Sequence, residues 1–157
     1  HNAIDTNVFK PTPSDFRERY GIGDRLMILG VASPWTERKG LSDFVRLAGE
    51  LDSEKYAIVL VGLSEKQVEE MPAGIVGLTR TDSREELAGI YSTADVFFNP
   101  TVEDNYPTVN LEAEACGTPV VTYDTGGCRE TVCREDSRVV AGYEGAFALI
   151  TELARSA

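Results

Sequence analysis

The sequence predicts an α/β fold, a three-layer α/β/α sandwich with a parallel sheet of five or six strands. Short apolar segments alternate with amphipathic helical segments along most of the 157 residues. The apolar segments are continuous and do not alternate with polar residues, which is typical of parallel strands buried on both faces. Right-handed crossovers between such strands place helices on both faces of the sheet.

The first residues differ from the rest of the chain. Residues 1–16 contain several Pro, Asn and Asp residues without periodicity, so we interpret them as a linker or arm. Residues 17–157 are predicted to form one domain, because this length and a 42% hydrophobic content are sufficient for a single core.

The predicted strands are short apolar runs bounded by polar or Gly-containing segments. The first two are almost purely aliphatic, and the third is weaker. In chain order the predicted strands span 25–32, 56–62, 74–79, 95–99, 118–123 and 138–141.

The segments between these strands carry helix signals. Ser64 is suited to cap one helix, and in another Leu87, Ile90 and Tyr91 recur at i, i+3 and i+4 behind an acidic first turn. In chain order the predicted helices span 15–20, 41–51, 64–71, 82–91, 107–116, a brief turn after 125–127, and 143–154.

The stretch between the fourth and fifth predicted strands, 95–99 and 118–123, has the strongest functional signal. Asn105 is suited to cap the helix, and Gly117 ends it. Because helical side chains lean toward the N-terminus, Asp104 and Glu112 are predicted to converge near the start of this helix.

Polar loops follow the predicted strands, and the carboxyl ends of parallel strands form one edge, where ligands bind in such sheets. Arg38 and Lys39 in the first loop can clamp a pyrophosphate, with Gly40 permitting close approach; two solvated charges at a helix start are the alternative. The loops at this edge span 33–39, 79–81, 100–107 and 124–127.

Composition excludes several classes of partner. A net charge of −11 and a pI near 4.5 oppose nucleic-acid binding and provide no basic face for acidic lipids. No run approaches the ~20 apolar residues of a membrane span, and no leader resembles a signal peptide. Three cysteines without paired spacing fit a reducing compartment, so a cytoplasmic protein is expected.

Acids beside a helix N-terminus suggest a ligand with two chemistries. Helix amides favour an anion such as phosphate, whereas an ionised carboxylate accepts hydrogen bonds from hydroxyls. A nucleotide sugar combines both. The alternative is that Glu103 and Asp104 only complement the helix dipole and that Glu112 is a solvated helix residue.

Four segments together resemble the C-terminal, donor-binding domain of the GT-B glycosyltransferases, specifically the retaining group 1 class (family 4). That resemblance implies a Rossmann-like domain forming the C-terminal half of a GT-B fold. The most specific segment is EDNYPTVNLEAEACGTPVV; the other segments are HNAIDTNVFKP, RKG and YSTADVFFNP.

The resemblance implies roles for individual residues. It implies that Glu112 holds the ribose hydroxyls of a nucleoside-diphosphate sugar and that Lys39 steadies the diphosphate. It also implies that the acidic loop contacts the sugar through Glu103 or Asp104, the candidate catalytic residues. Backbone groups near Thr79 are expected to contact the nucleotide base. The candidate donor-binding residues are Arg38, Lys39, Thr79, Asn105, Tyr106, Thr108, Val109, Asn110, Leu111 and Glu112.

This sequence departs from the family pattern at two points. The family usually has two glutamates with seven residues between them; eight residues lie between Glu103 and Glu112, and Asp104 occupies the seven-spaced position. The family's phosphate-binding Arg, five residues before the Lys, is replaced by Pro34, which leaves Arg38 as a substitute.

The resemblance also predicts that the acceptor-binding domain is absent from this chain. The leading hypothesis is the donor-binding half of a retaining glycosyltransferase, acting without a metal or other cofactor on a glycan or lipid-linked acceptor in bacterial polysaccharide or glycoconjugate synthesis. Peripheral membrane association would then depend on the missing half. The alternatives are a GT-B-like sugar-nucleotide epimerase and a non-catalytic regulatory module that binds nucleotide sugars.

Overall fold

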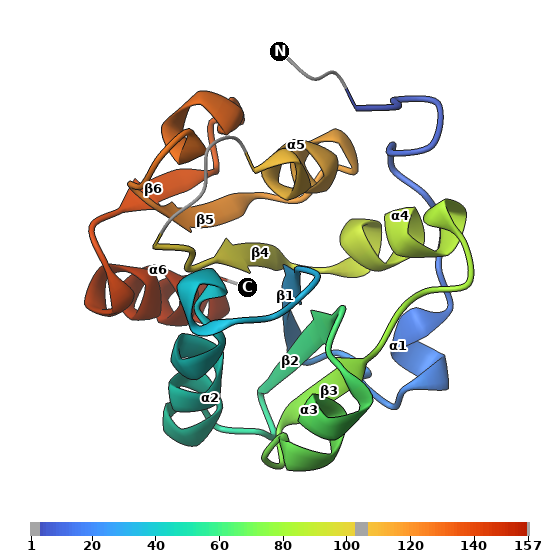
Figure 1. Ribbon diagram of the computed structural model, residues 1–157, viewed down its shortest axis with the longest axis vertical. Helices are drawn as coiled ribbons and strands as arrows, with labels where there is room; N and C mark the ends of the chain where they lie inside the picture. The colour runs from blue at the N-terminus through green and yellow to red at the C-terminus, as the bar shows by residue number, and fades with distance from the viewer. Residues whose placement is uncertain (1–3, 103–106, 157) are drawn as a thin grey trace.

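A computed structural model describes residues 4–102 and 107–156 and contains a six-stranded, fully parallel sheet in the order β3-β2-β1-β4-β5-β6 (Figure 1). The predicted parallel α/β architecture is therefore confirmed. The register between β1 and β2 is continuous from Leu26 opposite Tyr56 to Val31 opposite Val61. The strands are β1 (Leu26–Val31), β2 (Tyr56–Val61), β3 (Ile75–Leu78), β4 (Val96–Asn99), β5 (Val120–Tyr123) and β6 (Arg138–Val140).

Helices cover both faces of this sheet, as Figure 1 shows. One face carries α1, α4 and α5, and the other carries α2, α3 and α6. In the described part of the chain, no helix has both the length and the apolar character needed to cross a membrane. The helices are α1 (Phe16–Arg19), α2 (Leu41–Glu50), α3 (Glu65–Glu70), α4 (Arg84–Thr93), α5 (Thr108–Ala115) and α6 (Tyr143–Ser156), with 3-10 turns η1 (Glu37–Lys39) and η2 (Cys128–Thr131).

The core has two hydrophobic clusters, one on each face of the sheet. Successive strand residues supply opposite clusters: Phe97 packs under α4 and α5, and Phe98 packs on the side of α2 and α6. Both phenylalanines are 1% exposed, which accounts for the continuous apolar runs in the sequence.

Serine side chains cap the starts of α3 and α4, and the predicted cap Ser64 is confirmed. Ser64 accepts a hydrogen bond from the Gln67 amide in a capping box at the start of α3. In α4 the capping residue is Ser83, whose side chain accepts from the Glu86 amide. The predicted cap Asn105 lies outside the described residues.

The arm of residues 4–15 packs along α4. Phe9 is only 6% exposed, and its ring meets the Tyr91 ring edge-on with centroids 6.0 Å apart. Asp5 forms an ion pair of 2.7 Å with Arg84. The interpretation of 1–16 as an interdomain linker stays a prediction, and the structure adds that the described part of it contacts the core.

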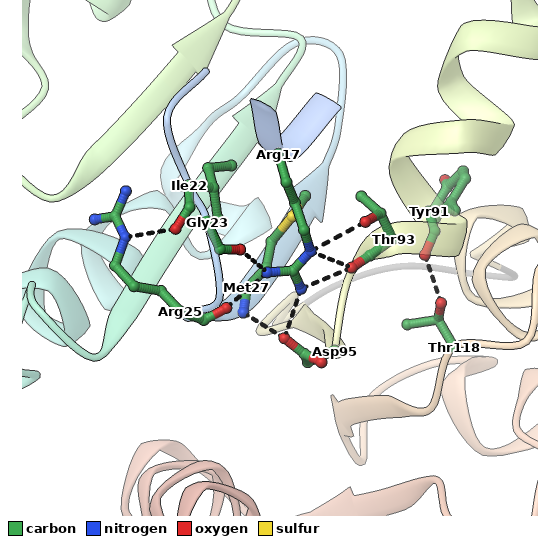
Figure 2. A network of polar contacts seen from close by, with 9 residues as sticks. All are labelled: Arg17, Ile22, Gly23, Arg25, Met27, Tyr91, Thr93, Asp95 and Thr118. Carbon is green, nitrogen blue, oxygen red and sulfur yellow. Dashed lines mark hydrogen bonds and ion pairs between the residues drawn. The ribbon is translucent and has the colours of Figure 1, made fainter. Parts of the chain in front are cut away.

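Arg17 organises the amino edge of the sheet, the edge opposite the loops described above (Figure 2). Its guanidinium donates to the carbonyl oxygens of Gly23 and Thr93 at 2.7 and 2.9 Å and pairs with Asp95 at 2.8 Å. The Asp95 carboxylate also accepts from the Met27 amide at 2.8 Å. This network joins α1 and the end of α4 to the starts of β1 and β4.

Candidate functional site

The strand order reverses between β1 and β4, and the connections after these two strands lead to helices on opposite faces, α2 and α5. In open parallel sheets the crevice at such a point is where ligands bind. A hollow of about 230 Å³ lies there. Its lining residues are Val31, Ala32, Ser33, Trp35, Lys39, Phe98, Asn99, Pro107, Thr108 and Val109.

The basic turn of η1 is fixed against the loop that follows β4. The Arg38 carbonyl accepts from the Val102 amide at 2.9 Å and from the Thr101 hydroxyl at 3.2 Å. Gly40 has φ +87°, and a Cβ there would lie 2.6 Å from the Pro100 carbonyl oxygen. Only glycine suits this position. Two loops far apart in sequence are thereby held side by side at the site.

The two predicted cations take different positions. The Arg38 side chain is exposed, whereas Lys39 is half-buried and lines the hollow. An ammonium group at this point provides positive charge next to the start of α5. That combination suits an anion such as a diphosphate.

The N-terminus of α5 faces the same hollow through Thr108 and Val109. Amides in the first turn of a helix lack intrahelical acceptors, so they are available to a ligand. The Asn110 amide, by contrast, donates to the Pro107 carbonyl at 3.1 Å.

The Asn110 side chain anchors this helix. It is fully buried and accepts from the Asn99 amide nitrogen while donating to the Thr131 hydroxyl, both at 3.0 Å. The Thr131 hydroxyl donates to the Cys128 carbonyl at 2.7 Å. The chain of hydrogen bonds ties β4, α5 and η2 together beneath the edge of the site.

Glu112 lies one turn beyond Thr108 on α5 and does not line the 230 Å³ hollow itself. Its Oε1 accepts a hydrogen bond of 2.7 Å from the Tyr91 hydroxyl. Burial raises the pKa of the Glu112 carboxyl, while the Tyr91 hydrogen bond and the Arg84 charge lower it. The carboxylate is thus partly desolvated beside a phosphate-sized hollow.

The structure brings together part of the predicted set. Lys39, Thr108 and Val109 share the hollow, with Glu112 one helical turn away. Thr79 is exposed just after β3, on the same edge but separated from β1 by β2. The half-buried Leu111 does not line the hollow. The predicted residues Glu103, Asp104, Asn105 and Tyr106 lie outside the described residues.

Sequence reasoning missed several contributors. Asn99 and Ser33 line the hollow, and Tyr91 contacts Glu112. Asn99 had a usable signal, since it is a polar residue at the end of an apolar strand. Trp35 is 4% exposed and its indole nitrogen donates to the Val61 carbonyl, and it also contributes to the hollow.

A larger hollow of about 620 Å³ lies between α4 and the segment leading into α1. It is lined by five acids, including Asp82 and Glu86, with Arg19 as the basic residue of the lining. It does not lie at the carboxyl ends of the strands. The smaller hollow combines Lys39 with a helix N-terminus, so we assign the candidate site there.

The model of the family described as "Glycosyl transferases group 1" matches residues 24–155. The chain belongs to the group 1 glycosyltransferases. Among curated relatives in this family, a GDP-mannose-dependent alpha-(1-6)-phosphatidylinositol monomannoside mannosyltransferase of Mycolicibacterium smegmatis is 34% identical over 83% of this chain and 39% of its own. A D-inositol 3-phosphate glycosyltransferase of Corynebacterium jeikeium is 32% identical over 71% of this chain and 30% of its own. The chain spans well under half the length of these two glycosyltransferases.

Solved glycosyltransferase structures share the fold. The crystal structure of Anabaena Alr3699/HepE in complex with UDP-glucose matches with a TM-score of 0.80 at 20% identity, over 99% of this chain and 47% of that one. The C-terminal domain of the group 1 protein LpcC from Francisella tularensis matches with a TM-score of 0.74 at 16% identity, over 98% of this chain and 88% of that domain. The predicted Rossmann-like, C-terminal half of a GT-B fold is confirmed.

Proposed function

We propose that this chain is the donor-binding half of a retaining glycosyltransferase that transfers a sugar from a nucleoside-diphosphate sugar to a glycan or glycoconjugate acceptor. The observation that carries the proposal is the juxtaposition of Lys39 with the N-terminus of α5 at the β1/β4 crevice, one helical turn from the partly buried Glu112. The curated relatives are glycosyltransferases, and the Anabaena neighbour binds UDP-glucose.

The diphosphate is proposed to lie against Lys39 and the amides of Thr108 and Val109. These groups are positioned before the ligand arrives, because η1 is fixed to the β4–α5 loop and Asn110 anchors α5. As the bond between sugar and diphosphate breaks, negative charge grows on the leaving phosphate oxygen. Fixed donors and a cation stabilise that charge without the cost of reorganising solvent.

The ribose is proposed to lie against Glu112. A carboxylate offers about four lone-pair sites, so the bond from Tyr91 leaves capacity for ribose hydroxyls. Glu103 or Asp104 remains the proposed contact with the sugar, and the backbone near Thr79 remains the proposed contact with the base.

The proposal includes no metal or other cofactor, because Lys39, Arg38 and the helix amides supply the positive charge that a diphosphate requires. It also places the protein in the cytoplasm, in keeping with the free thiols of Cys116, Cys128 and Cys133. Any peripheral attachment to a membrane, and binding of the acceptor, are assigned to parts of the protein other than the described site.

Isothermal titration calorimetry of the chain with UDP, GDP, UDP-glucose and GDP-mannose tests the proposal. Glu112→Ala is expected to weaken the preferred ligand by about 1.5–3 kcal/mol, the value of a hydrogen bond to a charged group. Lys39→Ala is expected to weaken binding of the nucleoside diphosphate more than binding of the nucleoside. Lys55 is an exposed lysine at the amino edge of the sheet, so Lys55→Ala serves as the charge-matched control and should change neither affinity. Unchanged affinity in Glu112→Ala, or equal losses for nucleoside and diphosphate in Lys39→Ala, would contradict the assigned roles.

A further inference from the structure

Tyr91 is a fully buried residue of α4 with one polar function directed at the site. Its ring packs against Phe9 from the arm and against Phe97 of β4, with centroids 6.0 and 5.5 Å away. Its carbonyl accepts from the Thr118 hydroxyl, a bond visible in Figure 2. With neighbours on the ring and the backbone, the hydroxyl has a fixed position 2.7 Å from Glu112 Oε1.

Tyr91 is the proton donor in this pair. Burial raises the pKa of the Tyr91 hydroxyl well above its ordinary value, so the hydroxyl stays protonated while Glu112 titrates. The hydrogen bond therefore favours the ionised form of Glu112 over the protonated form.

Three titratable or charged groups act on Glu112 from the elements packed around it. Tyr91 and Arg84, both on α4, lower its pKa and oppose the effect of burial. Arg84 is also paired with Asp5 of the arm at 2.7 Å. Cys116, the third group, lies one turn further along α5 and interacts with Glu112; burial raises the pKa of its thiol, which keeps it neutral.

We propose that Tyr91 is the positioning residue of the donor site, fixing the Glu112 carboxylate in the orientation and charge state that accept the ribose hydroxyls. This inference rests on the proposed function, which assigns the ribose to Glu112. Tyr91 acts through Glu112 and does not line the hollow at the crevice.

The physical basis is preorganisation. A glutamate side chain on a helix surface samples several rotamers, and a ligand that selects one of them must offset the lost freedom. A hydrogen bond from a ring that cannot move removes that freedom before binding. Loss of the hydroxyl is therefore expected to weaken binding about three- to tenfold, as when one flexible side chain must be ordered on association.

The test compares Tyr91→Phe with the wild-type chain, with Glu112→Gln and with Tyr123→Phe. Tyr123 is a matched control, because it is also a buried tyrosine that donates to a carboxylate, that of Asp43, but on the opposite face of the sheet. The probes are UDP and GDP with their nucleosides uridine and guanosine, titrated calorimetrically from about pH 5 to pH 8. The melting temperature of each variant is recorded to show that it is folded.

Tyr91→Phe is expected to bind the nucleoside three- to tenfold more weakly at neutral pH. The pH below which affinity falls is expected to rise, since the hydrogen bond that lowers the Glu112 pKa is gone. Tyr123→Phe should match the wild type in both respects. A merely structural role for Tyr91 would lower the melting temperature and leave the pH of this fall unchanged, which would overturn the inference.

The two proposals fail in different ways. If Glu112→Gln binds as the wild type does, or if the wild type binds none of the probes, the ribose role of Glu112 is overturned and the role of Tyr91 with it. If Glu112→Gln weakens binding but Tyr91→Phe follows the wild type at every pH, the proposed function stands and only the role of Tyr91 is overturned.

Discussion

Replacing Asn110 by alanine tests whether the buried polar chain under the site holds α5 in place. Asn110 is fully buried and bonds both Asn99 and Thr131. Its loss leaves the buried Asn99 amide without this acceptor, at a cost of about 1–3 kcal/mol, and removes the bond to Thr131, worth about 0.5–1.5 kcal/mol. The expected destabilisation is therefore about 1.5–4.5 kcal/mol, before any contribution from the cavity.

Urea unfolding followed by circular dichroism measures this change directly. Asn7→Ala is the control, because Asn7 is exposed in the arm and its replacement should change the free energy of unfolding by no more than about 0.5 kcal/mol. UDP or GDP affinity should also fall in Asn110→Ala, since the helix that presents Thr108 and Val109 loses its anchor. A loss of stability below about 0.5 kcal/mol would refute the view that these buried amides depend on each other.

Two further predictions concern backbone strain and charge. Gly40→Ala should destabilise the chain by at least about 2 kcal/mol, because the residue has a left-handed backbone and a Cβ would collide with Pro100. Gly49→Ala in α2 is the control: with open space around it, alanine should stabilise the helix by about 0.5–1 kcal/mol. Equal effects of the two substitutions in thermal melts would contradict this reasoning. The pKa of Glu112 is raised in the folded state, so folding favours the protonated carboxyl over the carboxylate. The protonated carboxyl therefore contributes to the stability of the fold below the ordinary pKa of 4.5, and this contribution is lost as pH rises through the folded-state pKa. Glu112→Gln should therefore match the wild-type melting temperature near pH 4 and exceed it at pH 7. Glu50 is the contrasting case, because the Tyr143 hydrogen bond lowers the pKa of its carboxyl. Glu50→Gln should melt at a lower temperature than the wild type at pH 7, and this difference should shrink on acidification. A pH-independent difference for Glu112→Gln would show that the carboxylate is not desolvated.

The sequence predicted the sheet well, because strands buried on both faces produce unbroken apolar runs such as the one from Tyr56 to Val61. It also predicted the edge of the sheet where the candidate site lies, since loops after parallel strands meet at one edge. These inferences depend on local periodicity and on topological rules, both of which are encoded over short stretches of chain.

The contacts within the candidate site were harder to predict from the sequence. The bond between Tyr91 and Glu112 joins residues 21 positions apart on helices that pack on the same face, and neither helix alone indicates it. Asn110 is a candidate donor-binding residue, and the sequence did not indicate that its side chain is buried and bonded to Asn99 and Thr131 from two other elements. Phe9 packs on Tyr91 although the arm around it has no periodicity.

The Arg17 network, drawn in Figure 2, joins the starts of β1 and β4, whereas the crevice lies after the ends of these strands. Several of its acceptors are main-chain oxygens, of Gly23, Arg25 and Thr93, so substitutions at those positions leave the acceptors in place. Changes to side chains that line the crevice, such as Ser33 and Thr108, therefore leave this network at the opposite edge of the sheet in place. A library of variants at the crevice should therefore keep Arg17, whose contacts hold the starts of β1 and β4 together.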